Sequence, residues 1–304
     1  SSVFAPFLGE HKTTGPIGKT IDIFSILVTL FGTAASLGLG ALQIGHGVEL
    51  VSGIGELGNG VLIAVIAVLT ACFIASAASG VAKGIQALSN INSVAAMILA
   101  LFVFFVGPSL LILNLLPGIA FQFISDLPMM MGRSGAQGEA TEQFLASWTV
   151  FYWAWWISWS PFVGMFIAKI SRARTIRQFV LVVIAVPSLI SLIWFAIFGT
   201  TAIDQQLGGA GLATSPPENV LFGVLENLPL TEITYIVLML LIAIFFITGA
   251  DSASLIMGTM SQQGDPTPKR WVTVTWGTLV GVIAAVLLVT GAEGSGLRAL
   301  QNVT

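Results

Sequence analysis

Four of the eight tryptophans of the chain stand close together inside one apolar run, residues 147–172. They are Trp153, Trp155, Trp156 and Trp159. Tryptophan in a membrane-spanning helix normally collects at the two membrane–water interfaces, where its N–H stays hydrated. A cluster inside such a run needs another reason, and aromatic faces attract a desolvated cation by about 2 kcal/mol or more per ring. We expect this stretch to hold a cation that has no proton to donate, such as a trimethylammonium group.

Helical spacing divides these aromatic residues. At about 100° per residue, five aromatic side chains fall within about 60° of one another: Trp148, Trp155, Trp159, Phe162 and Phe166. Trp156 flanks this stripe, and Trp153 points nearly opposite to it. We expect Trp148 to anchor the outer interface. A stripe at this spacing also suits core packing, so periodicity alone leaves a binding site and a packed core both open.

Pro161 lies inside the same run and removes one helical hydrogen bond, which frees a backbone carbonyl. Irregular backbone at membrane depth is tolerated where it lines a cavity. Gly164 adds room about one turn later. The pair favours a cavity beside the tryptophans.

Hydroxyl groups give a second chemistry in the apolar run 20–46. Ser25, Thr29 and Thr33 repeat every four residues, so they line one face of a helix. Oxygen ligands suit hard cations, by analogy with calcium and magnesium sites. The same hydroxyls can instead donate to the carbonyl four residues earlier. The spacing leaves an ion site and this structural role both open.

The run 232–259 repeats the pattern near its end. Thr248 and Ser252 are four residues apart, and Gly249 between them loosens the helix. Asp251 is an ionisable residue inside a predicted span, which marks a candidate functional position. It also lies toward one end of its helix, where water or a helix terminus could satisfy it.

The elements that position these residues are membrane spans. Of the 304 residues, 56% are hydrophobic and 8% charged, whereas a soluble domain carries about 25% charged residues. A membrane core of about 30 Å takes about 20 apolar residues. Seven runs are long enough: 20–46, 60–82, 92–116, 147–169, 177–199, 232–259 and 271–291. We predict an all-α polytopic membrane protein whose partner is the lipid bilayer, and the net charge of −3 gives no sign of a nucleic-acid partner.

Basic residues predict the orientation of these spans. Two basic residues fall on one predicted side, Arg133 and Arg298. Nine fall on the other: Lys12, Lys19, Lys83, Lys169, Arg172, Arg174, Arg177, Lys269 and Arg270. The positive-inside rule places these nine, and therefore residue 1, in the cytoplasm. Residues 117–131 of the loop 117–146 are amphipathic and are expected to lie along the outer interface.

Two other classes of membrane protein fit the chain poorly. A channel needs a continuous polar lining, and the predicted spans hold too few polar positions. An enzyme needs a nucleophile, a base or a metal cluster, but His11, His46 and Cys72 fall in separate segments. We predict that the protein is not an enzyme and has no cofactor.

Six segments together resemble the betaine/choline/carnitine transporter family, with the sodium-coupled glycine betaine transporters the most similar members. The segments are 79–86 (SGVAKGIQ), 115–118 (LLPG), 147–156 (SWTVFYWAWW), 158–162 (SWSPF), 171–177 (SRARTIR) and 250–254 (ADSAS). The resemblance covers essentially the whole chain. It implies a bacterial-type cell (inner) membrane protein.

Known members have twelve spans, in which spans three to twelve form two inverted repeats of the LeuT type. The seven runs here resemble spans five to eleven, so the chain is expected to be an internal piece of one transmembrane domain. Residues 1–19 then form a cytoplasmic loop and 20–116 the last three helices of repeat one. Residues 117–146 form an outer loop with an amphipathic helix, and 147–304 the first four helices of repeat two.

The resemblance also implies residue roles. Members hold an ammonium group in a tryptophan-lined box, which maps onto Trp155, Trp156 and Trp159, with Trp153 a less certain member. Their two sodium sites map onto Thr29, Thr33 and Phe162, and onto Thr248 with the carbonyl of Phe245. One departure stands out, because the sodium-coupled members carry Ser where this chain has Gly249.

The implied activity is sodium-driven import of glycine betaine or a related quaternary ammonium osmolyte by alternating access. Choline, carnitine, ectoine and dimethylsulfoniopropionate remain alternative substrates. Proton coupling also remains open, because helices outside this chain could supply an acid. Members often assemble as homotrimers, which is one expected assembly. Part of the family's site comes from helices that this chain lacks, so a non-transporting structural fragment also remains an alternative for the chain by itself.

Overall fold

The computed structural model describes residues 5–13, 15–55, 57–79, 82–171, 174–265 and 267–290. All regular structure in these ranges is helical. A π-helical turn, Leu145–Val150, leads directly into α8. The α-helices are α1 Ala5–Leu8, α2 Glu10–Thr13, α3 Pro16–Ser52, α4 Asn59–Ser79, α5 Ala82–Val106, α6 Ser109–Met131, α7 Glu139–Phe144, α8 Phe151–Ile170, α9 Ile176–Leu207, α10 Val220–Glu226, α11 Thr231–Ser261 and α12 Arg270–Thr290.

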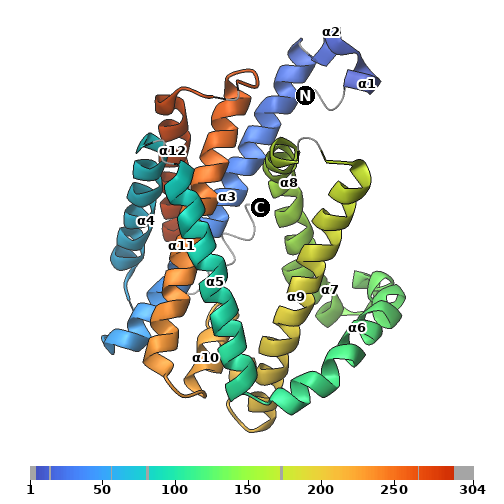
Figure 1. Cartoon of the computed structure of the whole chain (residues 1–304), viewed down its shortest axis with the longest axis vertical. Coiled ribbons are helices and arrows are strands. Elements are labelled where there is room, and N and C mark those ends of the chain that lie inside the picture. The colour runs from blue at the N-terminus through green and yellow to red at the C-terminus, as the bar shows by residue number, and fades with distance from the viewer. Residues whose placement is uncertain are drawn as a thin grey trace.

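Helix α3 is the centre of the larger hydrophobic core, and it packs against α4, α8, α11 and α12 (Figure 1). Small residues make this close packing possible, because they let another helix backbone approach. A Cβ added at Gly40 would overlap the ring of Phe246, and one added at Gly47 would lie 2.6 Å from Met239. Ala34, Leu37 and Ala41 of α3 are completely buried.

A second core lies toward the end of the molecule where α5 ends and α11 begins (Figure 1). Its buried members come from α5, α6, α9, α10 and α11 and the turn after α10: Leu99, Val103, Ile112, Ile197, Phe198, Phe222, Leu225, Leu228, Tyr235, Leu238 and Leu241. Helices α6, α7 and α9 stand on the opposite side of α3 from α4, α11 and α12 (Figure 1). Many apolar side chains of α8 and α9 are exposed.

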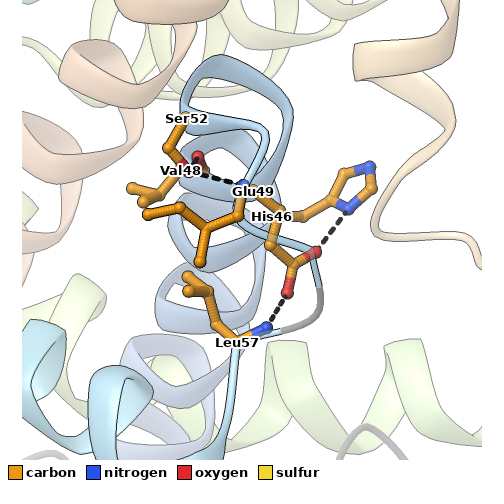
Figure 2. Close-up of polar contacts among 6 residues, drawn as sticks. His46, Val48, Glu49, Ser52 and Leu57 are labelled. Carbon is orange, nitrogen blue, oxygen red and sulfur yellow. Dashed lines mark hydrogen bonds and ion pairs between the residues drawn. The ribbon is translucent and has the colours of Figure 1, made fainter.

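The end of α3 and the turn to α4 are fixed by polar contacts around Glu49 (Figure 2). One carboxylate oxygen of Glu49 accepts the backbone N–H of Leu57 at 2.7 Å, and the other lies 3.2 Å from Nδ1 of His46. Gly53 ends the helix in the left-handed region, with φ of 66°, and donates its N–H to the carbonyl of Glu49. The imidazole of His46 packs edge-on against Phe222 of α10, with ring centroids 5.5 Å apart. These contacts tie the turn to α10.

Two predicted span boundaries were wrong. The predicted span 92–116 ends at Val106, because Gly107 and Pro108 break the helix there. A new helix, α6, begins at Ser109 and runs without interruption through Pro117 to Met131, so the amphipathic helix that we predicted from 117 starts earlier. In Figure 1 α6 leaves the end of α5 obliquely and runs away from the α3 bundle. Whether its second half lies at the outer interface stays a prediction.

Within the described part of the chain, seven helices are long and apolar enough to cross a membrane, the number that we predicted. The set differs from the prediction, because it contains α6 and omits α8. The reason is composition, since α8 replaces apolar side chains with four tryptophans, two serines and Pro161. Some basic residues used for the orientation fall outside the described part of the chain: Arg172 and Arg298, and the side chains of Lys12, Lys83 and Lys169. The cytoplasmic position of residue 1 stays a prediction.

Candidate functional site

The predicted aromatic and hydroxyl residues meet where α8 crosses α3. Gly32 of α3 makes this crossing close, because an added Cβ would overlap the hydroxyl of Ser158 and lie 3.3 Å from Cδ1 of Trp159. One turn further along α3, Ser36 contacts Trp155. The two helices therefore run antiparallel, and successive turns of α8 meet earlier turns of α3. This register places the aromatic stripe of α8 on the hydroxyl face of α3.

The indole of Trp155 is held by a chain of hydrogen bonds. Its N–H donates to Oγ of Ser36 at 3.0 Å, and the Ser36 hydroxyl donates to the carbonyl of Gly32 at 2.9 Å. The hydroxyl of Ser158 donates to the backbone carbonyl of Trp155 at 2.6 Å. Because Ser36 is only 3% exposed, this network orients the ring from within the helix interface.

The predicted stripe forms a ladder of aromatic rings along the crossing. Ring centroids lie 5.9 Å apart between Trp155 and Trp159 and 5.8 Å apart between Trp159 and Phe162, both edge-on. Phe166 extends the ladder at 6.4 Å from Phe162. Edge-on pairs at these distances stabilise an aromatic cluster. The structure thus brings together Trp155, Trp159 and Phe162.

The other two predicted box residues lie off this ladder. The side chain of Trp156 is 67% exposed, although its ring lies 6.1 Å from that of Trp155. Trp153 is also 67% exposed and faces away from α3. Trp148 stacks on Tyr152 at 6.1 Å, beyond the crossing. Within this chain, Trp156 and Trp153 present free aromatic faces rather than packed ones.

The indole nitrogen of Trp159 differs from that of Trp155. It is buried, and no acceptor among the described residues lies within hydrogen-bond distance. A buried donor without a partner is costly, by roughly 1–3 kcal/mol, unless a ligand or water satisfies it. The ladder therefore offers an aromatic face at Trp155 and an unused N–H at Trp159.

The carbonyl freed by Pro161 belongs to Ile157, four residues earlier. The hydroxyl of Ser160 donates to this carbonyl at 2.6 Å, so the helix continues through the proline. Any cavity on this side of α8 is then not a consequence of an open backbone group. This pairing was not foreseen from the sequence.

Thr29 and Thr33 lie buried at the crossing, 1% and 5% exposed. Each donates its hydroxyl hydrogen to the carbonyl four residues earlier, at 2.8 Å to Ser25 and 2.7 Å to Thr29. The hydroxyl hydrogens of Thr29 and Thr33 therefore bond within the helix, which is the alternative to an ion site given above. Each hydroxyl oxygen still has lone pairs that could bind a cation. Phe162 lies one turn beyond Ser158 and packs in the same core cluster as Ile26 and Leu30 of α3. That Thr29, Thr33 and Phe162 together form an ion site stays a prediction.

The second predicted ion site is a single turn of α11. The hydroxyl of Thr248 lies 3.1 Å from the carbonyl oxygen of Phe245 and also donates to the carbonyl of Ile244 at 2.9 Å. Ser252 donates to the carbonyl of Thr248 at 2.8 Å. A Cβ added at Gly249 would meet open space within 4 Å. This turn therefore presents oxygens beside an unfilled volume.

The one carboxylate predicted inside a span as a functional candidate, Asp251, lies in the interior of the fold. Asp251 is 7% exposed, on a buried face of α11 that it shares with Ala250 and Ser254. Among the residues that the structure describes, no group of three or more His, Cys, Asp or Glu side chains could hold a metal ion. The residues missed by sequence reasoning are Ser36 and Ser158. Their spacing was visible, since Ser36 follows Thr33 by three residues, as Ser158 follows Trp155.

The chain matches the model of the betaine/carnitine/choline family of transporters over residues 1–304. It is 51% identical to the betaine/ectoine transporter LcoP of Corynebacterium glutamicum, over 100% of this chain and 48% of LcoP. It is 45% identical to the glycine betaine transporter OpuD of Bacillus subtilis, over 99% of this chain and 58% of OpuD. It is 40% identical to the ectoine/glycine betaine/proline transporter EctP of Corynebacterium glutamicum, over 100% of this chain and 50% of EctP. The chain spans about half the length of these relatives.

Proposed function

The chain belongs to the betaine/carnitine/choline family of transporters, and we propose that the protein containing it imports glycine betaine or a related osmolyte across the bacterial cell membrane. The relatives carry betaine and ectoine in their names, which supports this substrate class. The chain is an integral membrane protein, not an enzyme. A tryptophan-lined site and sodium coupling are further parts of the proposal.

The proposal rests on the aromatic ladder of α8 and on the hydrogen bond that joins it to α3. A quaternary ammonium group has charge but no N–H, so no hydrogen-bond acceptor can bind it specifically. Aromatic faces can, and desolvation makes each contact worth about 2 kcal/mol or more. Trp155 is oriented by Ser36 and stands beside Trp159 and the free face of Trp156. Helices outside this chain would complete the enclosure.

The buried N–H of Trp159 has no acceptor among the described residues, which favours a substrate that also carries an acceptor. Glycine betaine, carnitine and ectoine have a carboxylate, whereas choline has only a hydroxyl. A hydrogen bond to a charged acceptor contributes roughly 1.5–3 kcal/mol, more than one to a neutral group. We therefore rank carboxylate-bearing solutes above choline for this protein.

Sodium is the proposed coupling ion. The oxygens of Thr29 and Thr33 and the pair formed by Thr248 and the Phe245 carbonyl have the hard character that sodium needs. In alternating access, sodium and substrate fill the midplane site, and the two repeats rock around it. The inward sodium gradient then drives accumulation of the osmolyte. Proton coupling is the competing form of the proposal.

The test is uptake by the full-length protein in proteoliposomes. Labelled glycine betaine is offered with an inward sodium gradient, with potassium in place of sodium, and with a proton gradient alone. We expect uptake in the first condition and competition by carboxylate-bearing quaternary solutes over choline. Uptake that persists unchanged in potassium would contradict sodium coupling, and failure to take up any onium osmolyte would contradict the substrate class.

A further inference from the structure

Asn92 lies inside helix α5 with a side-chain oxygen that nothing satisfies. This oxygen is buried, and no hydrogen-bond donor among the described residues reaches it. A buried carbonyl-type oxygen without a partner costs roughly 1–3 kcal/mol in proteins. The nearby asparagine on the same helix, Asn90, is exposed to solvent, so its side chain does not carry this energetic cost. The Asn92 oxygen is therefore a candidate ligand for a bound group.

Helical geometry shows which neighbour Asn92 faces. It lies one turn before Ala95 and Ala96 and so shares the face of α5 that carries Leu99 and Val103. Those four residues pack in the same cluster as Leu238, Leu241 and Ile242 of α11. Helix α11 packs along α5, and the two run antiparallel (Figure 1). One turn earlier on α5 thus corresponds to one turn later on α11.

That turn of α11 contains Phe245 and Thr248. Both lie on the same face as Leu238 and Leu241, because the spacing of three, four and seven residues returns to one side of a helix. Helix α9 diverges from α5 toward the N-terminal end of α5 (Figure 1), and its side chains at Val186 and Ile190 are exposed. From this register we infer that the buried oxygen of Asn92 faces the turn that presents the Thr248 hydroxyl and the Phe245 carbonyl.

We propose that Asn92 is a ligand of the coupling cation at this turn and takes the place of the hydroxyl that Gly249 lacks. This inference rests on the proposed sodium coupling. An amide oxygen is a hard, neutral ligand of the kind that binds such cations. In this proposal Asn92 Oδ1 joins the Thr248 hydroxyl and the Phe245 carbonyl, which lie 3.1 Å apart, as the third oxygen ligand. The open space beside Gly249 leaves room for the ion.

The experiment uses the full-length transporter with Asn92→Ala, and Asn90→Ala as the matched control. We expect Asn92→Ala to raise the sodium concentration for half-maximal betaine uptake at least about fivefold, and Asn90→Ala to leave it unchanged. Adding Gly249→Ser to Asn92→Ala should lower that concentration again, because a hydroxyl replaces the lost amide oxygen. The open volume at Gly249 accepts the serine without a clash.

A second readout does not depend on transport. Sodium should raise the melting temperature of the detergent-solubilised wild type and of Asn90→Ala, because a ligand that binds only the folded state stabilises it. The same addition should have little effect on Asn92→Ala. Without sodium, Asn92→Leu should be at least as stable as the wild type, because it removes the unpaired oxygen.

The outcomes separate the inference from the function on which it rests. If neither wild-type uptake nor wild-type melting temperature responds to sodium, the sodium coupling fails, and the role of Asn92 fails with it. If the wild type responds and Asn92→Ala responds at the same sodium concentration as Asn90→Ala, the sodium coupling stands and the proposed ligand is overturned.

Discussion

The indole N–H of Trp155 on α8 donates a hydrogen bond of 3.0 Å to the hydroxyl of Ser36 on α3. Ser36 lies three residues after Thr33, on the hydroxyl face of the same helix. The bond therefore joins the helix with the aromatic ladder to the helix with the first predicted ion site. A shift of α3 caused by an ion at Thr29 and Thr33 would be transmitted to the Trp155 ring through this contact.

Ser36→Ala should weaken substrate binding without abolishing transport. The change leaves the Trp155 N–H unpaired and frees its ring to rotate, a loss of about 1 kcal/mol. We expect KM for glycine betaine to rise about fivefold while the maximal rate falls little, measured by uptake in proteoliposomes. Ser36→Thr keeps the hydroxyl and should stay closer to the wild type than Ser36→Ala.

Ser52→Ala is the control for this variant. Ser52 also belongs to α3 and donates to the carbonyl four residues earlier, but it is exposed, and its hydrogen bonds are with the backbone of Val48 and Ile54. An equal rise of KM in Ser52→Ala would show that the effect comes from the loss of any α3 hydroxyl and not from Trp155.

Gly32→Ala should destabilise the α3–α8 crossing. The added methyl group would overlap the Ser158 hydroxyl and press on Trp159, and overpacking of this kind costs about 1–3 kcal/mol. We expect a lower melting temperature of the full-length protein in detergent. Gly164→Ala on α8 is the matched control, because its Cβ meets open space. Equal melting temperatures for the two variants would contradict the close crossing.

The sequence predicts which side chains share one face of a helix, because that depends on the helical period. It does not predict which residues of two different helices contact each other. The spacing of Trp155, Trp159 and Phe162 predicted the ladder, because helical geometry depends on local sequence alone. The hydrogen bond from Trp155 to Ser36 joins residues 119 positions apart, and no local pattern specifies it. The close approach at Gly32 is of the same kind.

The predicted boundaries of two helices were wrong because helix-breaking residues in the local sequence were given the wrong weight. The prediction weighed apolar length and carried one span through Gly107 and Pro108 to residue 116, although this pair is a strong helix breaker. It also started a separate amphipathic helix at Pro117, whereas α6 begins at Ser109 and runs through Pro117 to Met131. A proline inside a long apolar helix costs one hydrogen bond, and the remaining bonds on either side hold the helix together.

Trp159→Phe should change substrate preference more than it changes packing. The phenyl ring keeps an aromatic face for the ammonium but removes the buried N–H, which has no acceptor within the described part of the chain. We expect affinity for glycine betaine to fall about tenfold, the size of a charge-assisted hydrogen bond. Affinity for choline should change much less, as measured by competition against labelled betaine.

Trp148→Phe serves as the comparison for that variant, because Trp148 stacks on Tyr152 and is not one of the predicted box residues. We expect it to leave both affinities near those of the wild type. Equal losses for betaine and choline in Trp159→Phe would indicate that the indole acts through its aromatic face and not through its N–H.

Gly249→Ser should tighten sodium binding in the otherwise wild-type transporter. The sodium-coupled proteins that the chain resembles carry Ser at this position, and here a Cβ would meet open space, so the substitution introduces no clash. The new hydroxyl follows Thr248 directly on α11, where it can add one hard oxygen to the predicted site. One extra hydrogen-bond-strength contact of about 1 kcal/mol corresponds to about a fivefold lower sodium concentration for half-maximal uptake. Gly249→Ala is the control, because it adds the Cβ without the oxygen and should leave that concentration unchanged. If Gly249→Ser and Gly249→Ala behave alike, this turn of α11 does not bind the ion.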